Sequence, residues 1–220
     1  MAGESMALKI GVLITGRGSN LQSLIDATSQ PDFPAEIVTV ISNRAEAYGL
    51  KRAAQADIPH EVISHRDFET PEAFEDAIDD ALRRVGVELV CLAGFMRILS
   101  NAFITRWKNR IINIHPSLLP SFKGLHVHER VIESGSRISG CSVHYVRAEM
   151  DNGPIIVQAA VPVLMEDTPE TLAQRVLAWE HQIYPQAVRY IAEGRVRVTG
   201  EKVRITGAEA PAPGFMSPEQ

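Results

Sequence analysis

The sequence has 220 residues, 45% of them hydrophobic, a net charge of −5 and an isoelectric point of about 5.8. This length fits one α/β domain, or one large domain with a small appendage. Acidic and basic residues are interspersed, which argues against nucleic acid or an acidic membrane as a partner. Small anionic ligands remain open, because a local cluster of donors binds them even in an acidic protein.

Cys91 and Cys141 lie in separate apolar runs without CxxC spacing. We interpret both as free buried thiols in a reducing compartment. No apolar run reaches the length of a membrane-spanning helix, and residues 1–9 lack the charged-then-apolar layout of a signal peptide. We therefore expect a cytoplasmic protein.

Strands and helices are predicted to alternate through the first half of the chain. The expected strands are residues 8–14, 37–41, 59–63, 87–93 and 111–115. The expected helices follow the glycine turn at 16–20 and cover residues 45–56, 71–84 and 100–107. This alternation is typical of the α/β class and predicts a doubly wound, mostly parallel sheet of Rossmann-like type.

The pattern changes in the second half of the chain. Residues 140–147 and 154–163 are both β-rich, and the loop 148–153 between them is too short for a helix. We therefore predict that they pair as an antiparallel hairpin. Thr168 and Pro169 suit the cap and the first position of a long C-terminal helix.

The chain ends with a small hairpin and a tail. Residues 195–198 and 202–205 are predicted to pair around a Thr-Gly-Glu turn. We expect a single domain over residues 8–206, because no linker is long enough to divide it. Residues 207–220 are rich in Ala and Pro and are expected to be disordered.

Asn113 and His115 are the most informative polar pair. They lie two residues apart in the apolar strand 111–115, so both side chains point to the same face. Pro116 cannot donate to the sheet, so regular pairing is expected to end there. An amide and an imidazole then stand at the carboxyl end of a strand, where open α/β sheets bind ligands. The alternative is a pair of hydrogen-bonded core side chains, but the proline turn that follows favours function.

A glycine turn, Gly16-x-Gly18, follows the first strand. A dinucleotide-binding fingerprint needs a third glycine and an acidic residue after the second strand, and this sequence has neither. Gly18, Ser19 and Asn20 instead suit a terminal phosphate, which accepts hydrogen bonds from backbone N–H groups at a helix N-terminus. A plain strand-to-helix turn capped by Ser19 is the alternative.

Asp151 lies in the loop of the predicted hairpin. An Asp followed by Asn-Gly-Pro is by default a turn former. A hairpin at the sheet edge could also bring Asp151 over the end of strand 111–115, where its carboxylate would orient His115. Asn113, His115 and Asp151 would then be a polarising amide, a proton-bearing imidazole and an anionic partner.

No serine or cysteine lies in a nucleophile motif such as G-x-S-x-G. The polar set therefore favours direct acyl transfer, in which an amine attacks a carbonyl while the site stabilises the oxyanion and moves protons. His126 and His128 have H-x-H spacing, and His115 and His144 could approach them. No Cys or Glu joins them at metal-ligand spacing, so no metal site is expected.

Two further segments allow a structural and a functional interpretation. Residues 95–99 follow the fourth strand and are either core with a solvated Arg97 or a wall for a flat organic ligand. Glu180 on the last helix either faces solvent or accepts hydrogen bonds from sugar hydroxyls.

Several motifs occur in order along the chain. They are Gly16-Arg17-Gly18-Ser19-Asn20-Leu21, Leu92-Ala93-Gly94-Phe95-Met96-Arg97-Ile98-Leu99, Asn113-Ile114-His115-Pro116-Ser117-Leu118-Leu119-Pro120, Gly140-Cys141-Ser142-Val143-His144 and Asp151-Asn152-Gly153-Pro154. Together they resemble the phosphoribosylglycinamide formyltransferases, folate-dependent enzymes of purine biosynthesis. The resemblance covers nearly all of residues 9–195 and implies one formyltransferase catalytic domain.

The resemblance implies formyl transfer from the cosubstrate 10-formyltetrahydrofolate to the amino group of 5′-phosphoribosylglycinamide. Asn113, His115 and Asp151 match the family's catalytic trio. In the family the amide and the imidazole polarise the formyl oxygen, while the aspartate assists proton transfer and keeps the histidine charged. Small molecules are the expected partners, and the sequence leaves a homodimer open.

The resemblance also assigns binding residues. Gly18, Ser19 and Asn20 match the segment that holds the substrate phosphate, and Glu180 matches a contact to the ribonucleotide. The formyl-folate is expected at Met96, Arg97, Ile98, Leu99 and Asn113, with loop 148–153 closing over the pterin.

The chain departs from the family pattern at two places. It has Asn152 where many members carry a glycine after the aspartate. Some members place an arginine near the start of the third helix for folate contact. That alignment falls on Pro71, and Arg66 is the nearest candidate.

Other functions remain as alternatives. Formyltetrahydrofolate deformylase resembles this chain but carries an extra N-terminal regulatory domain and usually His at the position of Pro116. Methionyl-tRNA formyltransferase adds a C-terminal tRNA-binding domain, and a tRNA partner does not suit the acidic net charge of this chain. A nucleotide-binding oxidoreductase would need the third glycine and the acidic residue that this sequence lacks.

Overall fold

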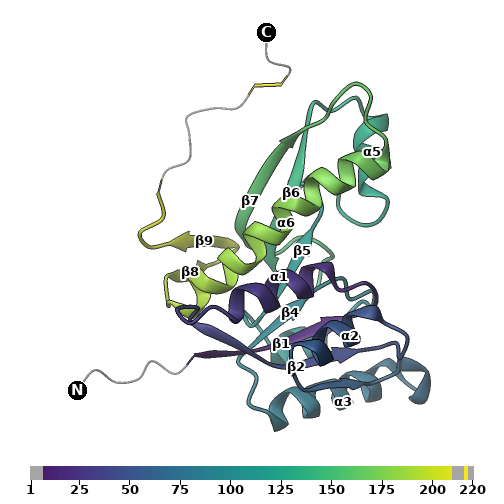
Figure 1. The fold of residues 1–220 in the computed structure, drawn as a ribbon, viewed down its shortest axis with the longest axis vertical. Coiled ribbons are helices and arrows are strands. Elements are labelled where there is room, and N and C mark those ends of the chain that lie inside the picture. The colour runs from purple at the N-terminus through teal and green to yellow at the C-terminus, as the bar shows by residue number, and fades with distance from the viewer. Residues whose placement is uncertain (1–6, 210–215, 218–220) are drawn as a thin grey trace. The chain divides into compact units, whose positions relative to one another are not determined.

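The computed structural model describes residues 7–209 and 216–217 (Figure 1). These residues form two compact units, one running up to Asn113 and including Tyr145–Ala148, the other made of Ile114–His144 and the chain from Glu149 onward. The single domain expected over residues 8–206 stays a prediction. The tail expected to be disordered lies outside the described residues at 210–215 and 218–220.

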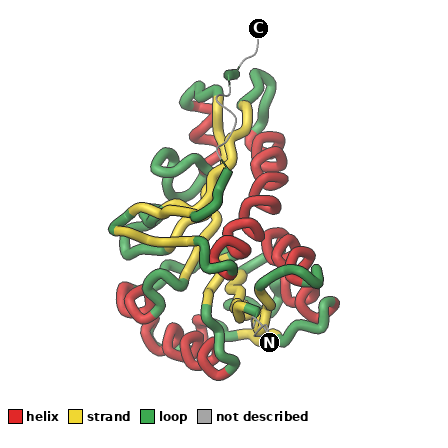
Figure 2. Tube along the Cα trace, turned by 90° about the vertical axis from the view of Figure 1, so that its left-hand side faces the viewer, coloured by secondary structure: helices red, strands yellow, loops and turns green. Residues whose placement is uncertain are grey.

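The first unit is built on parallel strands with helices between them in the sequence; Figure 2 draws strands in yellow and helices in red. Its strands are β1 (Leu8–Ile14), β2 (Ala35–Ser42), β3 (His60–Val62), β4 (Leu89–Leu92) and β5 (Ile111–His115), which continues into the second unit. They pair in parallel in the order β3-β2-β1-β4-β5. Its helices are α1 (Ser19–Thr28), α2 (Tyr48–Gln55), α3 (Pro71–Arg84) and α4 (Asn101–Arg106), with a 3-10 turn at His65–Asp67.

The central strands are buried on both faces, which explains their continuous apolar sequences. Val12 and Leu13 of β1, for example, point to opposite faces and are both fully buried. Such runs are typical of parallel sheets, and full burial of each aliphatic side chain contributes roughly 2 kcal/mol. Thr70 caps α3, because its hydroxyl accepts a hydrogen bond from the backbone N–H of Ala73.

The second unit contains the antiparallel hairpin and the longest helix. The strands β6 (Ile138–Tyr145) and β7 (Ile155–Pro162) pair antiparallel, and α6 (Pro169–Ala192) packs against β7 and against α5 (Val127–Glu133), as Figure 1 shows. The strands β8 (Val196–Thr199) and β9 (Lys202–Ile205) form the terminal hairpin. Thr168 and Thr171 bond reciprocally at the start of α6, which fixes where this helix begins.

The full strand order is β3-β2-β1-β4-β5-β6-β7, with the β8–β9 pair as a separate sheet. The predicted fold class is therefore confirmed: a mostly parallel α/β sheet with an antiparallel hairpin and a long helix. Helix α5 is absent from the sequence prediction, because its N-cap His126 has a left-handed backbone (φ 54) and makes no side-chain cap that a sequence could signal. No helix among the described residues is long and apolar enough to cross a membrane.

Candidate active site

His115 and Asp151 form a buried pair in the second unit. The Nδ1 atom of His115 lies 3.4 Å from Oδ2 of Asp151, and the two side chains are 8% and 10% exposed. His115 is the last residue of β5, whereas Asp151 lies in the loop between β6 and β7. The expected contact between the imidazole and the carboxylate is therefore present.

Two further groups hold the Asp151 carboxylate. The backbone N–H of Gly124 donates a hydrogen bond to Oδ2 at 2.9 Å, and Nε2 of His144 lies 3.8 Å from Oδ1. Asp151 has a left-handed backbone (φ 51), which Asp and Asn adopt more readily than other non-glycine residues. The carboxylate thus accepts a hydrogen bond from one backbone N–H group and lies between two imidazoles.

The second ring nitrogen of His115 faces a carbonyl group. Its Nε2 lies 2.9 Å from the carbonyl oxygen of Phe122. A carbonyl oxygen can only accept, so this contact assigns a proton to Nε2. Because the carboxylate at Nδ1 also accepts, the two partners together suit an imidazolium, which donates from both nitrogens.

A second set of hydrogen bonds ties the segment after β5 to the Asp151 loop. The Nζ of Lys123 donates to Oδ1 of Asn152 at 2.6 Å and lies 3.3 Å from Oε1 of Glu149. The side-chain amide of Asn152 donates to the other oxygen of Glu149 at 2.7 Å. These three side chains join the two segments beside the contact between Gly124 and Asp151.

Ser142 fixes the turn that follows His115. Its buried hydroxyl donates to the carbonyl oxygen of Ser117 at 2.7 Å. It also accepts from the N–H of Leu119 at 3.0 Å and from the side-chain amide of Gln158 at 2.8 Å. All of its hydrogen-bonding capacity is used, so the turn is held firmly against β6 and β7.

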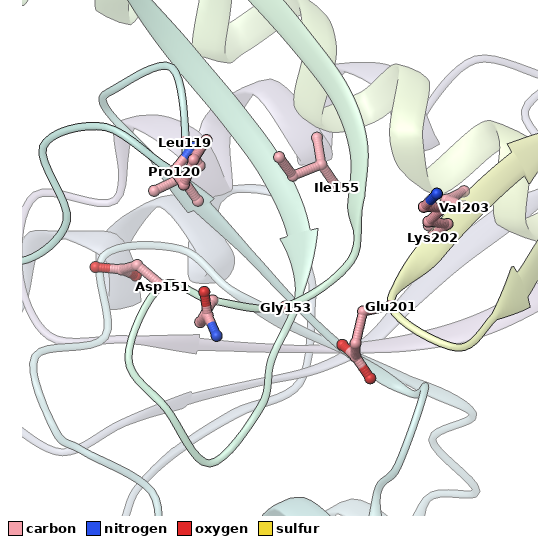
Figure 3. Close-up of a pocket in the computed structure, with 9 residues that line it drawn as sticks. Leu119, Pro120, Asp151, Gly153, Ile155, Glu201, Lys202 and Val203 are labelled. Atoms are coloured by element: carbon pink, nitrogen blue, oxygen red, sulfur yellow. The ribbon is translucent and has the colours of Figure 1, made fainter.

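A cavity of about 440 Å³ adjoins the Asp151 loop (Figure 3). Its lining mixes apolar, amide and charged side chains. The lining residues are Leu119, Pro120, Asp151, Asn152, Gly153, Ile155, Glu201, Lys202 and Val203. The terminal hairpin, which the sequence indicates only as structure, thus contributes to a cavity that is large enough for part of an organic ligand.

Asn113 precedes His115 by two residues on β5 and pairs with Leu92 of β4. Strand alternation places its side chain on the same side of β5 as that of His115. Its amide nitrogen can donate a hydrogen bond to an oxygen that develops negative charge. That the amide and the imidazole act together in one site stays a prediction.

The candidate phosphate segment lies at the start of α1 in the first unit. Gly18 is the N-cap with φ 69, Ser19 is the first helical residue, and no side chain caps this helix. The alternative turn, with Ser19 as the cap, is therefore not the one observed. Asn20 is buried in the first turn. Oriented N–H groups and the helix dipole favour an anion at such an uncapped N-terminus.

Gly49 of α2 supports the phosphate segment. A Cβ atom on Gly18 would lie 2.7 Å from the Cα atom of Gly49, so the two backbones approach too closely for any other residue at position 18. The N–H of Gly49 donates to the carbonyl oxygen of Gly16 at 3.0 Å. The guanidinium of Arg52 donates to the carbonyl oxygen of Arg17, also at 3.0 Å. Sequence reasoning misses both α2 residues, because this close approach leaves no local pattern.

Residues 96–99 differ sharply in exposure. Met96 and Ile98 are 66% and 80% exposed, and Arg97 is exposed as well. Leu99 instead lies buried in the core of the first unit. Exposed apolar side chains next to a strand end suit contact with a flat ligand, so only part of this segment belongs to the core.

The two remaining predicted residues lie in different environments. Glu180 on α6 is 7% exposed, so the interpretation that it faces solvent is wrong. Burial, with a smaller contribution from the charge of Glu180, raises the pKa of the Cys141 thiol to about 12. Arg66 is exposed in the 3-10 turn, where its backbone N–H donates to the hydroxyl of Ser64 at 3.3 Å.

The histidines of the H-x-H motif have unlike surroundings. His126 is largely exposed and lies 3.6 Å from Glu129. His128 is partly buried, and this burial lowers the pKa of its imidazole. Within the part of the chain that the structure describes, no three His, Cys, Asp or Glu side chains gather to hold a metal ion.

Residues 8–188 match the formyl transferase family. The chain belongs to that family. It is similar to the phosphoribosylglycinamide formyltransferase of Haemophilus influenzae, at 44% identity over 94% of this chain and 98% of the relative. It is also similar to the crystal structure of glycinamide ribonucleotide transformylase 1 from Symbiobacterium toebii, with a TM-score of 0.89 and 48% identity over 92% of this chain and 95% of the other.

Longer relatives contain the same family segment. The trifunctional purine biosynthetic protein adenosine-3 of Bos taurus is 51% identical over 90% of this chain, but the match covers 19% of that relative. The chain therefore spans about a fifth of the length of this trifunctional relative. The family resemblance that the sequence motifs indicate is therefore confirmed for this chain.

Proposed function

We propose that this chain transfers the formyl group of 10-formyltetrahydrofolate to the amino group of 5′-phosphoribosylglycinamide, a step of purine biosynthesis. The observation that carries the proposal is the buried contact of His115 with Asp151, on a strand that also presents Asn113. Membership in the formyl transferase family supports it. So do the names of the bacterial relatives that align over nearly their full length.

The proposed reaction is a direct acyl transfer. The amino nitrogen attacks the formyl carbon, a C–N bond forms, and the carbonyl oxygen becomes an oxyanion. Collapse of this tetrahedral centre breaks the bond between the formyl carbon and N10 of the folate. The proton lost by the attacking amine goes to N10, so atoms and charges balance without a covalent enzyme intermediate.

Asn113 and His115 donate hydrogen bonds to the developing oxyanion. The Nε2–H of His115, which faces the carbonyl of Phe122, donates to the formyl oxygen instead when the formyl donor displaces that carbonyl. One carbonyl oxygen replaces another, so the ring keeps its orientation while Asp151 still faces Nδ1. Each donor aimed at an oxyanion is typically worth about 3 kcal/mol of transition-state stabilisation.

Asp151 has two roles in this scheme. Its carboxylate supplies the negative charge that balances an imidazolium at position 115, and it assists the movement of the proton from the amine to N10. The N–H of Gly124 and the ring of His144 orient the carboxylate for both roles.

The proposal extends to the substrate contacts. Gly18, Ser19 and Asn20 bind the phosphate of the ribonucleotide at the uncapped start of α1, and Glu180 contacts the same substrate. Residues 96–99, Asn113 and Arg66 contact the formyl-folate. Met96 and Ile98 supply the apolar surface that a pterin ring needs.

The decisive assay follows loss of the formyl group from 10-formyltetrahydrofolate with and without phosphoribosylglycinamide. We expect turnover only when the ribonucleotide is present, with the formylated ribonucleotide as the product. Turnover with water alone at a comparable rate overturns the proposal and assigns the chain as a formyltetrahydrofolate deformylase, the second candidate from the sequence.

We also propose the cytoplasm as the location of the enzyme and small molecules as its partners. Cys91 and Cys141 are fully buried and free, as expected for structural thiols in a reducing compartment.

A further inference from the structure

The hydroxyl group of Thr15 joins three segments of the first unit that are far apart in sequence. Thr15 follows the last residue of β1 and is buried. Its hydroxyl donates to Oδ1 of Asn43, just after β2, at 2.8 Å. It accepts from the backbone N–H of Met96, just after the β4 turn, also at 2.8 Å. The carboxyl ends of three neighbouring strands thus meet at one oxygen atom.

These bonds fix each other's direction. A threonine hydroxyl has one proton, and the buried Asn43 oxygen takes it. The lone pairs of Thr15 then face the N–H of Met96, so that bond is aligned rather than incidental. Removal of the hydroxyl would leave a buried amide oxygen and a backbone N–H without this partner.

The segment held by Thr15 follows directly on the sheet. The N–H of Ala93 donates to the carbonyl oxygen of Leu13 at 2.9 Å, which continues the sheet up to the turn. Phe95 and Leu99 are buried in the core on either side of residues 96–98, whereas the side chains of Met96 and Ile98 extend into solvent. The bond at Met96 therefore holds the backbone at the point where the exposed apolar surface begins.

We propose that Thr15 is a positioning residue for the formyl donor: its hydroxyl fixes the backbone of Met96 and thereby the surface offered by residues 96–99. The inference rests on the proposed function, because that function assigns these residues to the folate. Thr15 acts through Met96 and touches no substrate.

The test compares Thr15→Val, which has nearly the same shape but no hydroxyl, with Thr15→Ser, which keeps the hydroxyl. We expect Thr15→Val to raise the KM for 10-formyltetrahydrofolate and the Kd for tetrahydrofolate by roughly tenfold each. The KM for the ribonucleotide should change by less than about twofold, and Thr15→Ser should restore most of the donor affinity. Amide hydrogen exchange at Met96 should become faster in Thr15→Val alone.

Thr39→Val is the matched control, because Thr39 is a buried threonine of β2, four residues before Asn43 in the sequence. It should leave both KM values and the Met96 exchange rate unchanged. Thr15→Ala provides a second hydroxyl deletion that cannot overpack the site, should Thr15→Val unfold.

Three outcomes overturn the inference: unchanged donor affinity in both hydroxyl deletions, an equal rise in both KM values, or Met96 exchange that does not respond. Failure of the proposed function looks different. In that case the wild-type chain transfers no formyl group to the ribonucleotide, while the tetrahydrofolate Kd and the Met96 exchange rate still decide the role of Thr15.

Discussion

Asp151 combines a charge with a left-handed backbone (φ 51), and the two are separable by substitution. Asn tolerates this conformation about as well as Asp, whereas Ala does not. Asp151→Asn therefore removes the charge beside His115 without straining the chain. We expect kcat to fall by about 10³-fold with little change in stability, measured by steady-state kinetics and urea unfolding.

Asp57 offers the matched control for that substitution. It also has a left-handed backbone (φ 56) but is exposed on the first unit. Asp57→Asn should leave kcat unchanged. Retention of more than about a tenth of wild-type turnover in Asp151→Asn contradicts the role given to the carboxylate.

Cys91 and Cys141 should be chemically inert in the folded protein. Both are fully buried, and burial raises the pKa of Cys141 to about 12, so essentially no thiolate forms at about pH 8. We expect no reaction of the native protein with an aromatic disulfide reagent. Two thiols should react once guanidinium chloride unfolds the chain. Rapid modification of the native protein at either position contradicts this expectation.

At the level of elements, the loop between β6 and β7 is tied to the segment after β5 by Lys123 and Asn152. Because Lys123 is partly exposed, each contact is modest in energy. Asn152→Gly and Lys123→Met should each lower kcat by about threefold. The double variant should be no worse than either single one, because both remove the same tie.

Lys108→Met is the matched control for Lys123→Met, since Lys108 is an exposed lysine of the first unit. Its kcat should match the wild type. Fully multiplicative effects in the double variant show that Lys123 and Asn152 act independently, which is the opposite of the arrangement described.

Hydrogen bonds to the Asp167 carboxylate hold the start of α6. The Asp167 carboxylate receives hydrogen bonds from the guanidinium of Arg175 at 2.6 and 2.8 Å, from the hydroxyl of Thr171 and from the N–H of Leu164. The bond with Arg175 is the main reason that the pKa of Asp167 lies well below its usual range. The folded state therefore favours the ionised form, which stabilises the protein above the unfolded pKa and is lost as the pH falls.

Asp167→Asn should accordingly be destabilised by about 2 kcal/mol near pH 7, with the difference from wild type shrinking below about pH 4. Urea unfolding at both pH values checks this. Asp80→Asn, an exposed acid on α3, should show no such pH-dependent difference. If the difference in unfolding free energy between Asp167→Asn and the wild type stays constant with pH, Asp167 acts through its shape rather than its charge.

At the scale of the whole molecule, local patterns predict the elements better than they predict the site. The period-two and apolar runs locate the sheet strands, and Thr70 and Thr168 mark helix starts because capping is chemistry between close neighbours. Asn113 and His115 are found for the same reason, since two residues on one strand share a face.

The parts that the sequence does not reveal depend on contacts between distant segments. Phe122 and Gly124 meet His115 and Asp151 in a segment that Ser142 and the bond between Lys123 and Asn152 help to hold. Left-handed backbones at Phe122 and Asp151 likewise depend on their surroundings. The pairing of His115 with Asp151 could be expected from family resemblance, but its second partner, the Phe122 carbonyl, could not.

Ligand binding should stabilise the whole chain and so distinguish the remaining functional classes. A ligand at about 100 times its Kd adds about 2.7 kcal/mol to the free energy of unfolding. We expect phosphoribosylglycinamide to raise the Tm by several degrees and NAD or NADP to leave it unchanged. A shift with either dinucleotide and none with the ribonucleotide supports an oxidoreductase or a nucleotide sensor.

In the protein without ligand, the carbonyl oxygen of Phe122 occupies the Nε2 position of His115 that the formyl oxygen would use. Under the proposed mechanism, the formyl oxygen must displace this internal acceptor from His115. The apparent donor affinity then equals the intrinsic affinity multiplied by the fraction of molecules in which the Phe122 carbonyl has moved away from Nε2. Variants that loosen the segment around Phe122 should bind the donor more tightly while turning it over more slowly. Affinity and speed would thus be set against each other by a single backbone oxygen.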